Sequence, residues 1–207
     1  MNASDAVICL VDDEESIRSA LTDLLESTGF TARAYASGRE FLESLTDNAP
    51  PCCLILDVRL VGASGLEFQQ QLKRAGISIP IVFITGHGDI PMAVEAMKEG
   101  AVDFLAKPFR DQELLDAINR AIARGRTERE QQAGLAEVQL RFDVLTPRER
   151  EVMLLVVRGL LNKQIASELG MSETTVKVHR GQVMRKMQAD SLPDLVRMAD
   201  KLALGGP

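Results

Sequence analysis

Apolar and polar positions alternate in blocks along the first 123 residues. Short apolar runs, typical of buried strands, are separated by segments in which apolar side chains recur every three or four positions, as on one face of a helix. Short continuous strands joined by helices predict parallel βαβ units and a small doubly wound α/β domain with a five-stranded parallel sheet. The predicted strands are Val7–Val11, Thr31–Tyr35, Cys52–Leu56, Ile79–Ile84 and Val102–Leu105.

The pattern becomes charged and polar over residues 124–142, which predicts a helical linker. Apolar residues at Leu135, Val138 and Phe142 leave two interpretations open: a linker with an adhesive stripe, or a solvated semi-rigid spacer. The chain is therefore expected to consist of residues 1–123, the linker 124–142, and residues 143–207.

After the linker the pattern is entirely helical and predicts a small all-α domain of four short helices. Thr146 and Glu149 have the spacing of a capping box, with Pro147 at the first helical position. Such caps satisfy backbone N–H groups that have no partner within the helix. The predicted cap residues of the four helices are Thr146, Asn162, Ser172 and Ser191.

The formal net charge of −6 is unevenly divided. Residues 1–123 contain 10 Lys and Arg against 19 Asp and Glu, whereas residues 143–207 contain 10 against 8. The averaged charge argues against a nucleic-acid partner, but the division indicates an acidic module followed by a mildly basic one. The basicity is too weak to predict DNA binding by itself.

The remaining composition points to a cytoplasmic protein. No apolar run reaches the roughly 18–20 residues that span a bilayer, and the first apolar run reads as a strand, not as a signal peptide. Cys9, Cys52 and Cys53 lack zinc-binding spacing and are expected to be reduced core residues. His87 and His179 have no second ligand nearby in sequence, so neither is expected to bind a metal.

Polar residues stand at the ends of the predicted strands. In a parallel α/β sheet the carboxyl ends of the strands form the ligand-binding edge. Crowded carboxylates favour a hard divalent cation such as Mg²⁺, and phosphoryl transfer requires positioning and charge neutralisation more than covalent help. The strand ends supply these groups as Asp12, Asp13, Asp57, Thr85 and Lys107.

The segments VDDEES, LILDVR, FITGHGD and FLAKPF resemble the receiver domain family, which has a flavodoxin-like fold. The resemblance implies that Asp57 accepts a phosphoryl group from a sensor histidine kinase. It implies Mg²⁺ held directly by Asp13 and Asp57, through water by Asp12, and by the backbone carbonyl of Arg59. It further implies phosphoryl contacts from Thr85 and Lys107, an aromatic switch at Phe104 and a cis Lys107–Pro108 bond. His87, next to Thr85 in the sequence, is expected to influence the access of water to the phosphoryl group.

The loop after Asp57 departs from the family. Many relatives have Met-Pro-Gly where this chain has Leu60-Val61-Gly62. Losing the proline frees the loop and leaves the lifetime of the phosphoryl group open, although phosphorylation itself is still expected. The alternative is a degenerate receiver that switches without phosphate.

The C-terminal helices have the spacing of a helix-turn-helix, Lys163–Leu169 and then Glu173–Met187, separated by a turn at Gly170. The side of the second helix that is expected to face the core carries Val176, Val183, Met184 and Met187. Basic residues on the other side are expected to meet base edges or phosphates, although a solvated helix face would have the same composition. The expected DNA contacts are Lys163, Thr174, Thr175, Lys177, Val178, Arg180, Gly181, Arg185 and Lys186.

Residues 143–204 resemble the LuxR-type DNA-binding domain. Together with a receiver this is similar to the NarL/FixJ class of response regulators, and most of all to its FixJ, TodT and StyR branch. Relatives read bases at the positions of Lys177, Val178 and Gly181. Because Gly181 has no side chain, either the backbone packs closely on DNA or the contact shifts to Arg180, and we favour the second.

The resulting expectation is a phosphorylation-activated transcription regulator and not an enzyme. Its implied partners are a sensor histidine kinase, RNA polymerase, a second copy when phosphorylated, and promoter DNA with an inverted-repeat site. One alternative is an aspartyl-phosphate phosphatase of the haloacid dehalogenase type, but those enzymes carry an Asp-x-Asp motif after the first strand, whereas here Asp57 follows the third. A receiver with an RNA-binding output is the other alternative.

Overall fold

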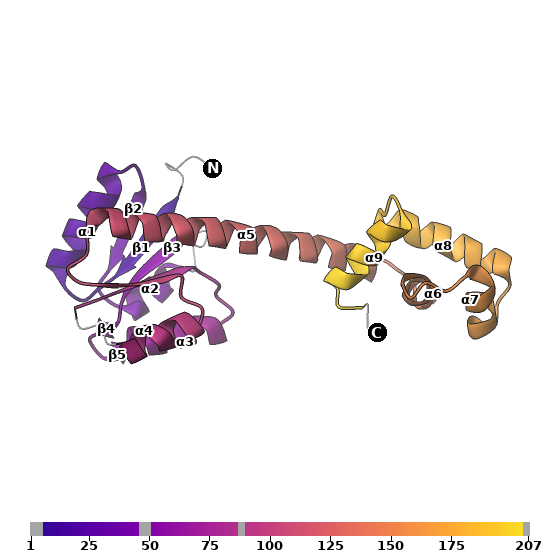
Figure 1. Cartoon of the computed structure of the whole chain (residues 1–207), viewed down its shortest axis with the longest axis horizontal. Coiled ribbons are helices and arrows are strands. Elements are labelled where there is room, and N and C mark those ends of the chain that lie inside the picture. Colours follow the sequence, from indigo (N-terminus) through magenta and orange to yellow (C-terminus); the bar gives the residue numbers. More distant parts are fainter. Residues whose placement is uncertain (1–5, 46–50, 87–89, 205–207) are drawn as a thin grey trace. The chain divides into compact units, whose positions relative to one another are not determined.

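The computed structural model describes residues 6–45, 51–86 and 90–204. The chain divides into two compact units, residues 1–128 and 129–207 (Figure 1). Each unit is described by itself.

The first unit is built on a parallel sheet. Its strands are β1 (Val7–Val11), β2 (Thr31–Tyr35), β3 (Cys53–Asp57), β6 (Ile81–Thr85) and β7 (Asp103–Ala106), in the order β2-β1-β3-β6-β7. This confirms the predicted five-stranded parallel sheet. The first two strands have the predicted bounds, and the other three lie one or two residues further along the chain.

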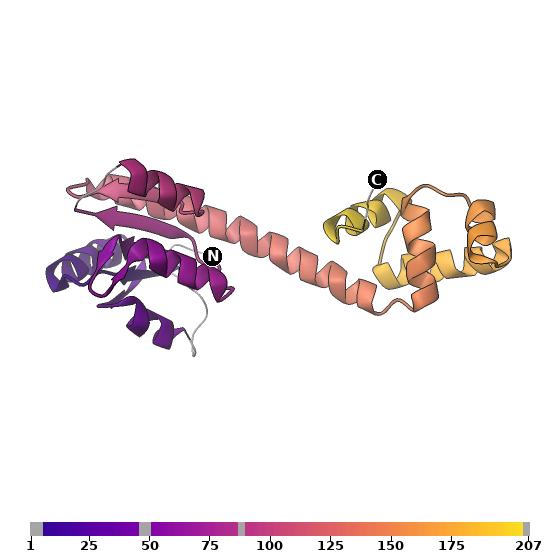
Figure 2. The same cartoon turned by 90° about the horizontal axis from the view of Figure 1, so that it is seen from below.

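Helices cover both faces of this sheet (Figure 1, Figure 2). One face packs against α1 (Glu15–Ser27) and the first turns of α5 (Asp111–Asp143), in a core that includes Leu25 and Ile118. The other face packs against α2 (Gly38–Ser44), α3 (Gly65–Arg74) and α4 (Ile90–Lys98). The central strands β3 and β6 are buried along their whole length, as expected for strands covered on both sides.

A small hairpin beside β3 was not predicted. Strands β4 (Arg59–Leu60) and β5 (Ala63–Ser64) pair antiparallel, and Gly62 between them has a φ of 86°. Two-residue strands are too short to show any periodicity in the sequence. The hairpin follows Asp57 directly and therefore shapes the loop at the carboxyl end of β3.

The second unit is helical. It contains α6 (Pro147–Val157), α7 (Asn162–Leu169), α8 (Glu173–Met187) and α9 (Leu192–Lys201), together with the last turns of α5. Its core includes Val138 of α5, Val152, Ile165 and Val183. The polar segment 124–142 is helical and forms part of α5. Val138 is buried and Phe142 packs against the same core, whereas Leu135 remains 44% exposed.

Three of the four predicted helix caps are confirmed, and one is wrong. Thr146 and Glu149 form a capping box on α6, and Ser172 and Ser191 cap α8 and α9. The prediction that Asn162 caps α7 was wrong. Leu161 occupies the cap position, and its N–H donates to Gln164 Oε1 at 2.8 Å. Asn162 is the first helical residue, and its side chain is bound to Arg180 instead.

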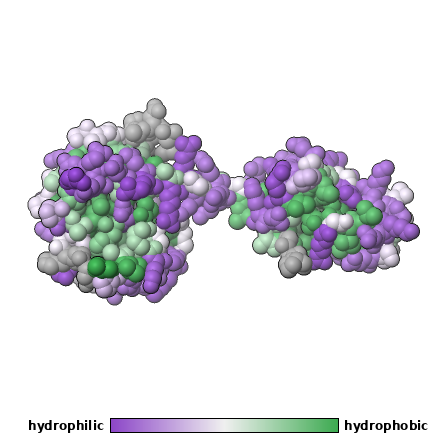
Figure 3. Space-filling model, viewed as in Figure 1, coloured by the Kyte–Doolittle hydropathy of each residue, from purple (hydrophilic) through white to green (hydrophobic). Residues whose placement is uncertain are grey.

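Apolar side chains also reach the surface of both units (Figure 3). In the first unit they include three residues of α4: Ile90, Val94 and Met97. Among the described residues, no helix is both long and apolar enough to cross a membrane.

Candidate functional site

Three of the predicted residues meet at the carboxyl edge of the sheet. Asp12 follows β1, Asp57 ends β3, and Lys107 follows β7. Lys107 Nζ lies 2.8 Å from Asp12 Oδ2 and 2.7 Å from Asp57 Oδ2. Asp12 is fully buried and Asp57 is 5% exposed, so one ammonium bridges two carboxylates that are almost removed from solvent.

The second oxygen of each carboxylate binds the backbone. Glu14 N–H donates to Asp12 Oδ1 at 2.9 Å, and Arg59 N–H donates to Asp57 Oδ1 at 2.8 Å. Each N–H lies two residues beyond the carboxylate that it holds, a local arrangement typical of Asp in turns. The carboxylates are thus fixed by their own loops as well as by the lysine.

The electrostatics of this trio reflect burial opposed by pairing. Burial raises the pKa of Asp57, and the hydrogen bonds from Lys107 and Arg59 offset only part of that rise. Burial alone would lower the pKa of Lys107, but its hydrogen bonds to Asp12 and Asp57 outweigh burial, and the pKa is raised. The lysine therefore stays charged next to a carboxylate that is costly to keep ionised.

Asp13 and Arg59, which follow Asp12 and Asp57 closely in the chain, are both exposed. Arg18, which sequence reasoning missed, fixes the acidic loop: its Nη1 donates to the carbonyl oxygens of Asp12 and Asp13, at 2.8 and 2.9 Å. The sequence does not reveal this contact, because an arginine in the first turn of a helix is common and usually points into solvent.

Thr85 ends β6 and is fully buried, and its carbonyl oxygen accepts the N–H of Lys107 at 2.7 Å. Phe104 lies on the neighbouring strand β7, half-buried, with its ring centroid 6.4 Å from that of Phe83. The Lys107–Pro108 peptide bond is cis, as predicted. His87 lies outside the described residues.

Gly65 sets the distance between α3 and the end of β3. A Cβ atom at this position would lie 2.3 Å from the carbonyl oxygen of Asp57, so only glycine fits. Ser64 and Glu67 form a capping box that starts α3 at this point. The sequence carried this signal, since Ser-x-x-Glu is a capping pattern.

The residues at this edge fit a divalent cation in donor type and in charge. Asp12, Asp13 and Asp57 carry carboxylate oxygens, the type of ligand that Mg²⁺ prefers. Their formal charge is −3, and Lys107 binds two of the three, Asp12 and Asp57. In the described part of the chain, however, no three such side chains converge tightly enough to form a metal cluster.

In the second unit, α7 and α8 form the predicted helix-turn-helix. Gly170 ends α7 in the left-handed conformation with a φ of 64°. Val176, Val183 and Met187 of α8 are buried, and Met184 packs partly against them. The opposite side of the motif is exposed, and it carries seven of the nine expected DNA contacts: Lys163, Thr174, Thr175, Lys177, Val178, Gly181 and Arg185.

The other two expected contacts are partly buried and bind residues of other helices in the unit. Arg180 Nη1 donates to Asn162 Oδ1 at 2.8 Å and so joins α8 to the start of α7. Lys186 Nζ lies 2.6 Å from Glu149 Oε2, a buried carboxylate in the cap of α6. Burial would raise the pKa of Glu149, but the hydrogen bonds from Lys186 and Thr146 outweigh burial and lower it. His179 on α8 is half-buried.

Both units resemble known protein families. Residues 8–119 match the response regulator receiver domain, and residues 143–199 match the luxR family of bacterial regulatory proteins. The chain is 54% identical to nodulation protein W of Bradyrhizobium diazoefficiens over 202 residues, which cover 98% of this chain and 88% of that protein. It is 47% identical to the response regulator protein TodT of Pseudomonas putida, with the same coverage of each chain.

Two solved structures match nearly the whole chain. The response regulator StyR has a TM-score of 0.80 and 45% identity, over 95% of this chain and 98% of that one. Full-length FixJ from B. japonicum has a TM-score of 0.59 and 40% identity, over 97% and 98%. The chain therefore belongs to the response regulators of two-component systems, with a receiver domain followed by a LuxR-type DNA-binding domain.

Proposed function

We propose that this response regulator is activated by phosphorylation of Asp57, after which it dimerises and binds promoter DNA. The observation that carries the proposal is the pairing of two buried carboxylates with Lys107 at the carboxyl edge of the sheet. A buried carboxylate that is costly to keep ionised, beside a fixed cation, is suited to take up and hold a phosphoryl group.

In the proposed transfer, a carboxylate oxygen of Asp57 attacks the phosphorus of a phosphohistidine on a sensor kinase. The P–N bond breaks, its electron pair returns to the imidazole nitrogen, and that nitrogen takes a proton from solvent. Lys107 and the hydroxyl of Thr85 would bind the phosphoryl oxygens. Asp13, Asp57, the carbonyl of Arg59 and, through water, Asp12 would hold Mg²⁺, which when bound supplies charge neutralisation.

The proposed switch continues along the sheet to the α4 face. Movement of Thr85 toward the phosphoryl group would draw in Phe104, which is half-buried on the adjacent strand. That change would reshape the face of α4 and β7, where Val94 is 44% and Met97 46% exposed. A second copy would cover these apolar side chains and so pair two DNA-binding domains.

The exposed side of α7 and α8 supports the DNA step. We propose that Lys177, Val178 and Gly181 meet base edges, and that Lys163 and Arg185 meet phosphates, with Thr174 and Thr175 at the start of α8. Because Arg180 is bound to Asn162, we assign it the positioning of α8 against α7. We likewise assign Lys186 to the cap of α6 through Glu149.

Labelling with acetyl phosphate and Mg²⁺ tests the phosphorylation step. Intact-mass measurement should show one added phosphoryl group, lost in Asp57→Asn and retained in Asp23→Asn, an exposed aspartate on α1. Undiminished labelling of Asp57→Asn would refute the assignment.

Light scattering and mobility shifts test the later steps. Beryllofluoride should convert a monomer into a dimer that binds an inverted-repeat fragment more tightly, since two linked contacts can raise avidity by roughly 10²–10⁴. Lys177→Ala should relax the sequence preference. Equal mass and equal DNA affinity with and without beryllofluoride would show that pairing is not the switch.

A further inference from the structure

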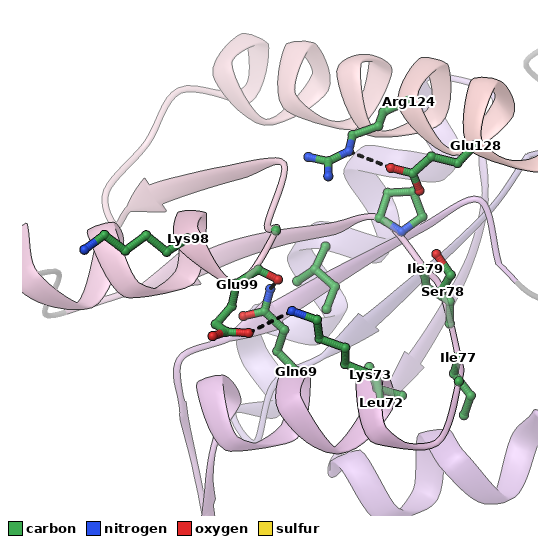
Figure 4. A pocket seen from close by; sticks show the side chains of 14 residues that line it. Gln69, Leu72, Lys73, Ile77, Ser78, Ile79, Lys98, Glu99, Arg124 and Glu128 are labelled. Atoms are coloured by element: carbon green, nitrogen blue, oxygen red, sulfur yellow. Dashed lines mark hydrogen bonds and ion pairs between the residues drawn. The ribbon is translucent and has the colours of Figure 1, made fainter. Parts of the chain in front are cut away.

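Arg18 of α1 binds backbone carbonyls, whereas several other arginines on the receiver helices bind carboxylates. Arg124 is an example: its Nε donates to Glu128 Oε1 at 2.8 Å, one turn along α5 (Figure 4). Arg39 pairs with Glu43 in the same way on α2. Arg18 also stands in an acidic stretch, yet within the part of the chain that the structure describes it pairs with no carboxylate. Instead its side chain leans back toward the start of the helix, as long helical side chains do, and reaches the loop before α1.

A single nitrogen of Arg18 holds the two peptide planes on either side of Asp13. Nη1 donates to the carbonyl oxygen of Asp12 at 2.8 Å and to that of Asp13 at 2.9 Å. The first carbonyl belongs to the peptide that precedes the Asp13 Cα atom, and the second belongs to the peptide that follows it. Because each peptide is planar, only φ and ψ can rotate between the two planes. Holding both planes therefore holds both torsions of Asp13, and with them the direction in which its side chain leaves the backbone.

Asp13 is the carboxylate at this edge whose side chain is not already held. Asp12 and Asp57 both bind Lys107, and each accepts a backbone N–H on its second oxygen. By contrast, no hydrogen bond or ion pair of the described residues reaches the carboxylate of Asp13, which is exposed. The placement of this carboxylate therefore depends on the Asp13 backbone, and Arg18 holds that backbone.

We infer that Arg18 is a positioning residue for the divalent cation and acts through Asp13. Among the described residues, the three carboxylates do not converge into a metal cluster, so Asp13 has to turn before it can bind a cation beside Asp57. While Arg18 holds the two peptide planes, only the side chain of Asp13 has to be ordered. Without Arg18 the backbone of Asp13 must be ordered as well, which should weaken binding by about tenfold. The inference rests on the proposed function in one respect, the presence of the cation at this edge.

The charge of Arg18 would act in the opposite direction. A guanidinium close to the site repels a divalent cation, so removal of a charge alone should strengthen the binding of Mg²⁺. Removal of a positioning contact should weaken it. The direction of the change in affinity therefore separates the two roles.

Amide NMR of the full-length chain, with MgCl₂ as the only ligand, measures this affinity. The amide signals of residues 12–14 and 57–59 follow the titration. Arg18→Met should weaken Mg²⁺ binding by about tenfold. Arg39→Met, which removes an arginine from an exposed ion pair on α2, should leave the affinity unchanged. Arg18→Gln, whose side chain is too short to reach the carbonyl oxygens, should behave like Arg18→Met and serves if that variant does not fold.

Backbone relaxation in the absence of Mg²⁺ tests the position of the loop itself. The amides of Asp13 and Glu14 lie in the two peptide planes that Arg18 holds. Their order parameters should be near the value of rigid backbone, about 0.85, in the wild type and should fall toward about 0.6 in Arg18→Met. The order parameter of Val58, next to Asp57, should not change.

The rate of labelling by acetyl phosphate gives a readout that general destabilisation would not reproduce. In Arg18→Met the Mg²⁺ concentration at half-maximal rate should rise. The rate at saturating Mg²⁺ should stay within about twofold of the wild type, because Arg18 contacts neither Asp57 nor Lys107 and serves only to bind the cation.

Four results would overturn the inference. They are Mg²⁺ affinity that is unchanged or tighter in the Arg18 variants, an equal loss of affinity in Arg39→Met, unchanged order parameters at Asp13 and Glu14, and an absence of Mg²⁺-dependent shifts in the wild type. Each of these leaves the labelling of Asp57 to be judged by itself. Conversely, a failure to label Asp57 would contradict the proposed function and leave the measured affinities and order parameters as they are.

Discussion

Asp57 illustrates how a candidate functional residue can lower stability. It is almost fully buried, and it shares Lys107 with Asp12 instead of having a cation to itself. Burial raises its pKa above the ordinary value of an aspartate. The folded chain therefore binds a proton at Asp57 more readily than the unfolded chain does. Stability contributed by this residue falls as the pH rises from the ordinary pKa through the raised one.

Replacing Asp57 by a neutral residue of the same shape should therefore stabilise the receiver. We expect Asp57→Asn to raise the free energy of unfolding near neutral pH, because a neutral amide avoids the cost of burial that raises the pKa of Asp57. Urea unfolding in EDTA measures this without divalent cations. The advantage should shrink as the pH falls below the ordinary aspartate pKa, and the exposed control Asp23→Asn should show none. A variant less stable than the wild type would contradict the prediction.

Gly65 affects the same loop sterically and not through charge. Gly65→Ala would place a Cβ atom 2.3 Å from the Asp57 carbonyl oxygen, so α3 and the end of β3 must separate. We expect a loss of about 2 kcal/mol, typical of overpacking, and slower labelling by acetyl phosphate. Gly181→Ala is the matched control: nothing lies within 4 Å of its Cβ, and it should stabilise α8 by about 1 kcal/mol. Equal stability of Gly65→Ala and the wild type would refute the steric argument.

At the scale of elements, the hydrophobic periodicity of the sequence predicted the regular strands and helices. It failed for features that depend on a tertiary contact or on only a few residues. Strands β1 and β2 have their predicted bounds, and at β1 the apolar run is ended directly by Asp12 and Asp13. The β4–β5 hairpin has no periodic signal. Asn162 has the chemistry of a cap, but a hydrogen bond from Arg180, eighteen residues later, takes its side chain. The trio of Asp12, Asp57 and Lys107 was predictable because parallel strands bring their carboxyl ends together, whereas Arg18 acts through a contact that no pattern announces.

The cap of α6 also joins two elements, because Glu149 binds both Thr146 and Lys186. Lys186→Met should leave the nearly buried Glu149 carboxylate without its cation and lower the stability of the DNA-binding unit by about 2 kcal/mol or more. The pKa of Glu149 is lowered, so the stability from this pair is present above the ordinary glutamate pKa and is lost as the pH falls through the folded value.

Thermal unfolding of Lys186→Met and of the exposed control Lys177→Met, compared near neutral and at acidic pH, measures this effect. The gap between Lys186→Met and the wild type should narrow at acidic pH. Equal stability of the two variants at neutral pH would count against a structural role for Lys186.

At the scale of the whole molecule, one helix contributes to two cores. Ile118 of α5 is fully buried in the receiver, and Val138 of the same helix is 5% exposed in the DNA-binding unit. Arg141 Nη1 also donates to the carbonyl oxygen of Met187, at 3.3 Å. The apolar positions in the linker segment are thus partly core residues, which its polar composition concealed.

The contribution of α5 to the core of the second unit predicts where an independent DNA-binding fragment must begin. A fragment of residues 129–207 retains Val138, Arg141 and Phe142. A fragment of residues 143–207 lacks them and exposes the core that they cover. The shorter fragment should be less stable by about 3 kcal/mol, the burial of one or two large apolar side chains. Urea unfolding of both fragments measures the difference. Val138→Ala in the longer fragment should reproduce part of the loss, and identical midpoints would show that α5 adds nothing.

The three thiols of the receiver have a practical consequence for labelling chemistry. Cys9, Cys52 and Cys53 are free and buried, burial raises the pKa of Cys9 to about 11, and that of Cys53 is raised further still. Since the thiolate is the reactive form, maleimides should spare these residues at neutral pH while the sheet is closed. A cysteine introduced on the surface could then carry a dye or spin label in an otherwise natural chain. In the same experiment, alkylation of the three native thiols would detect opening of the sheet.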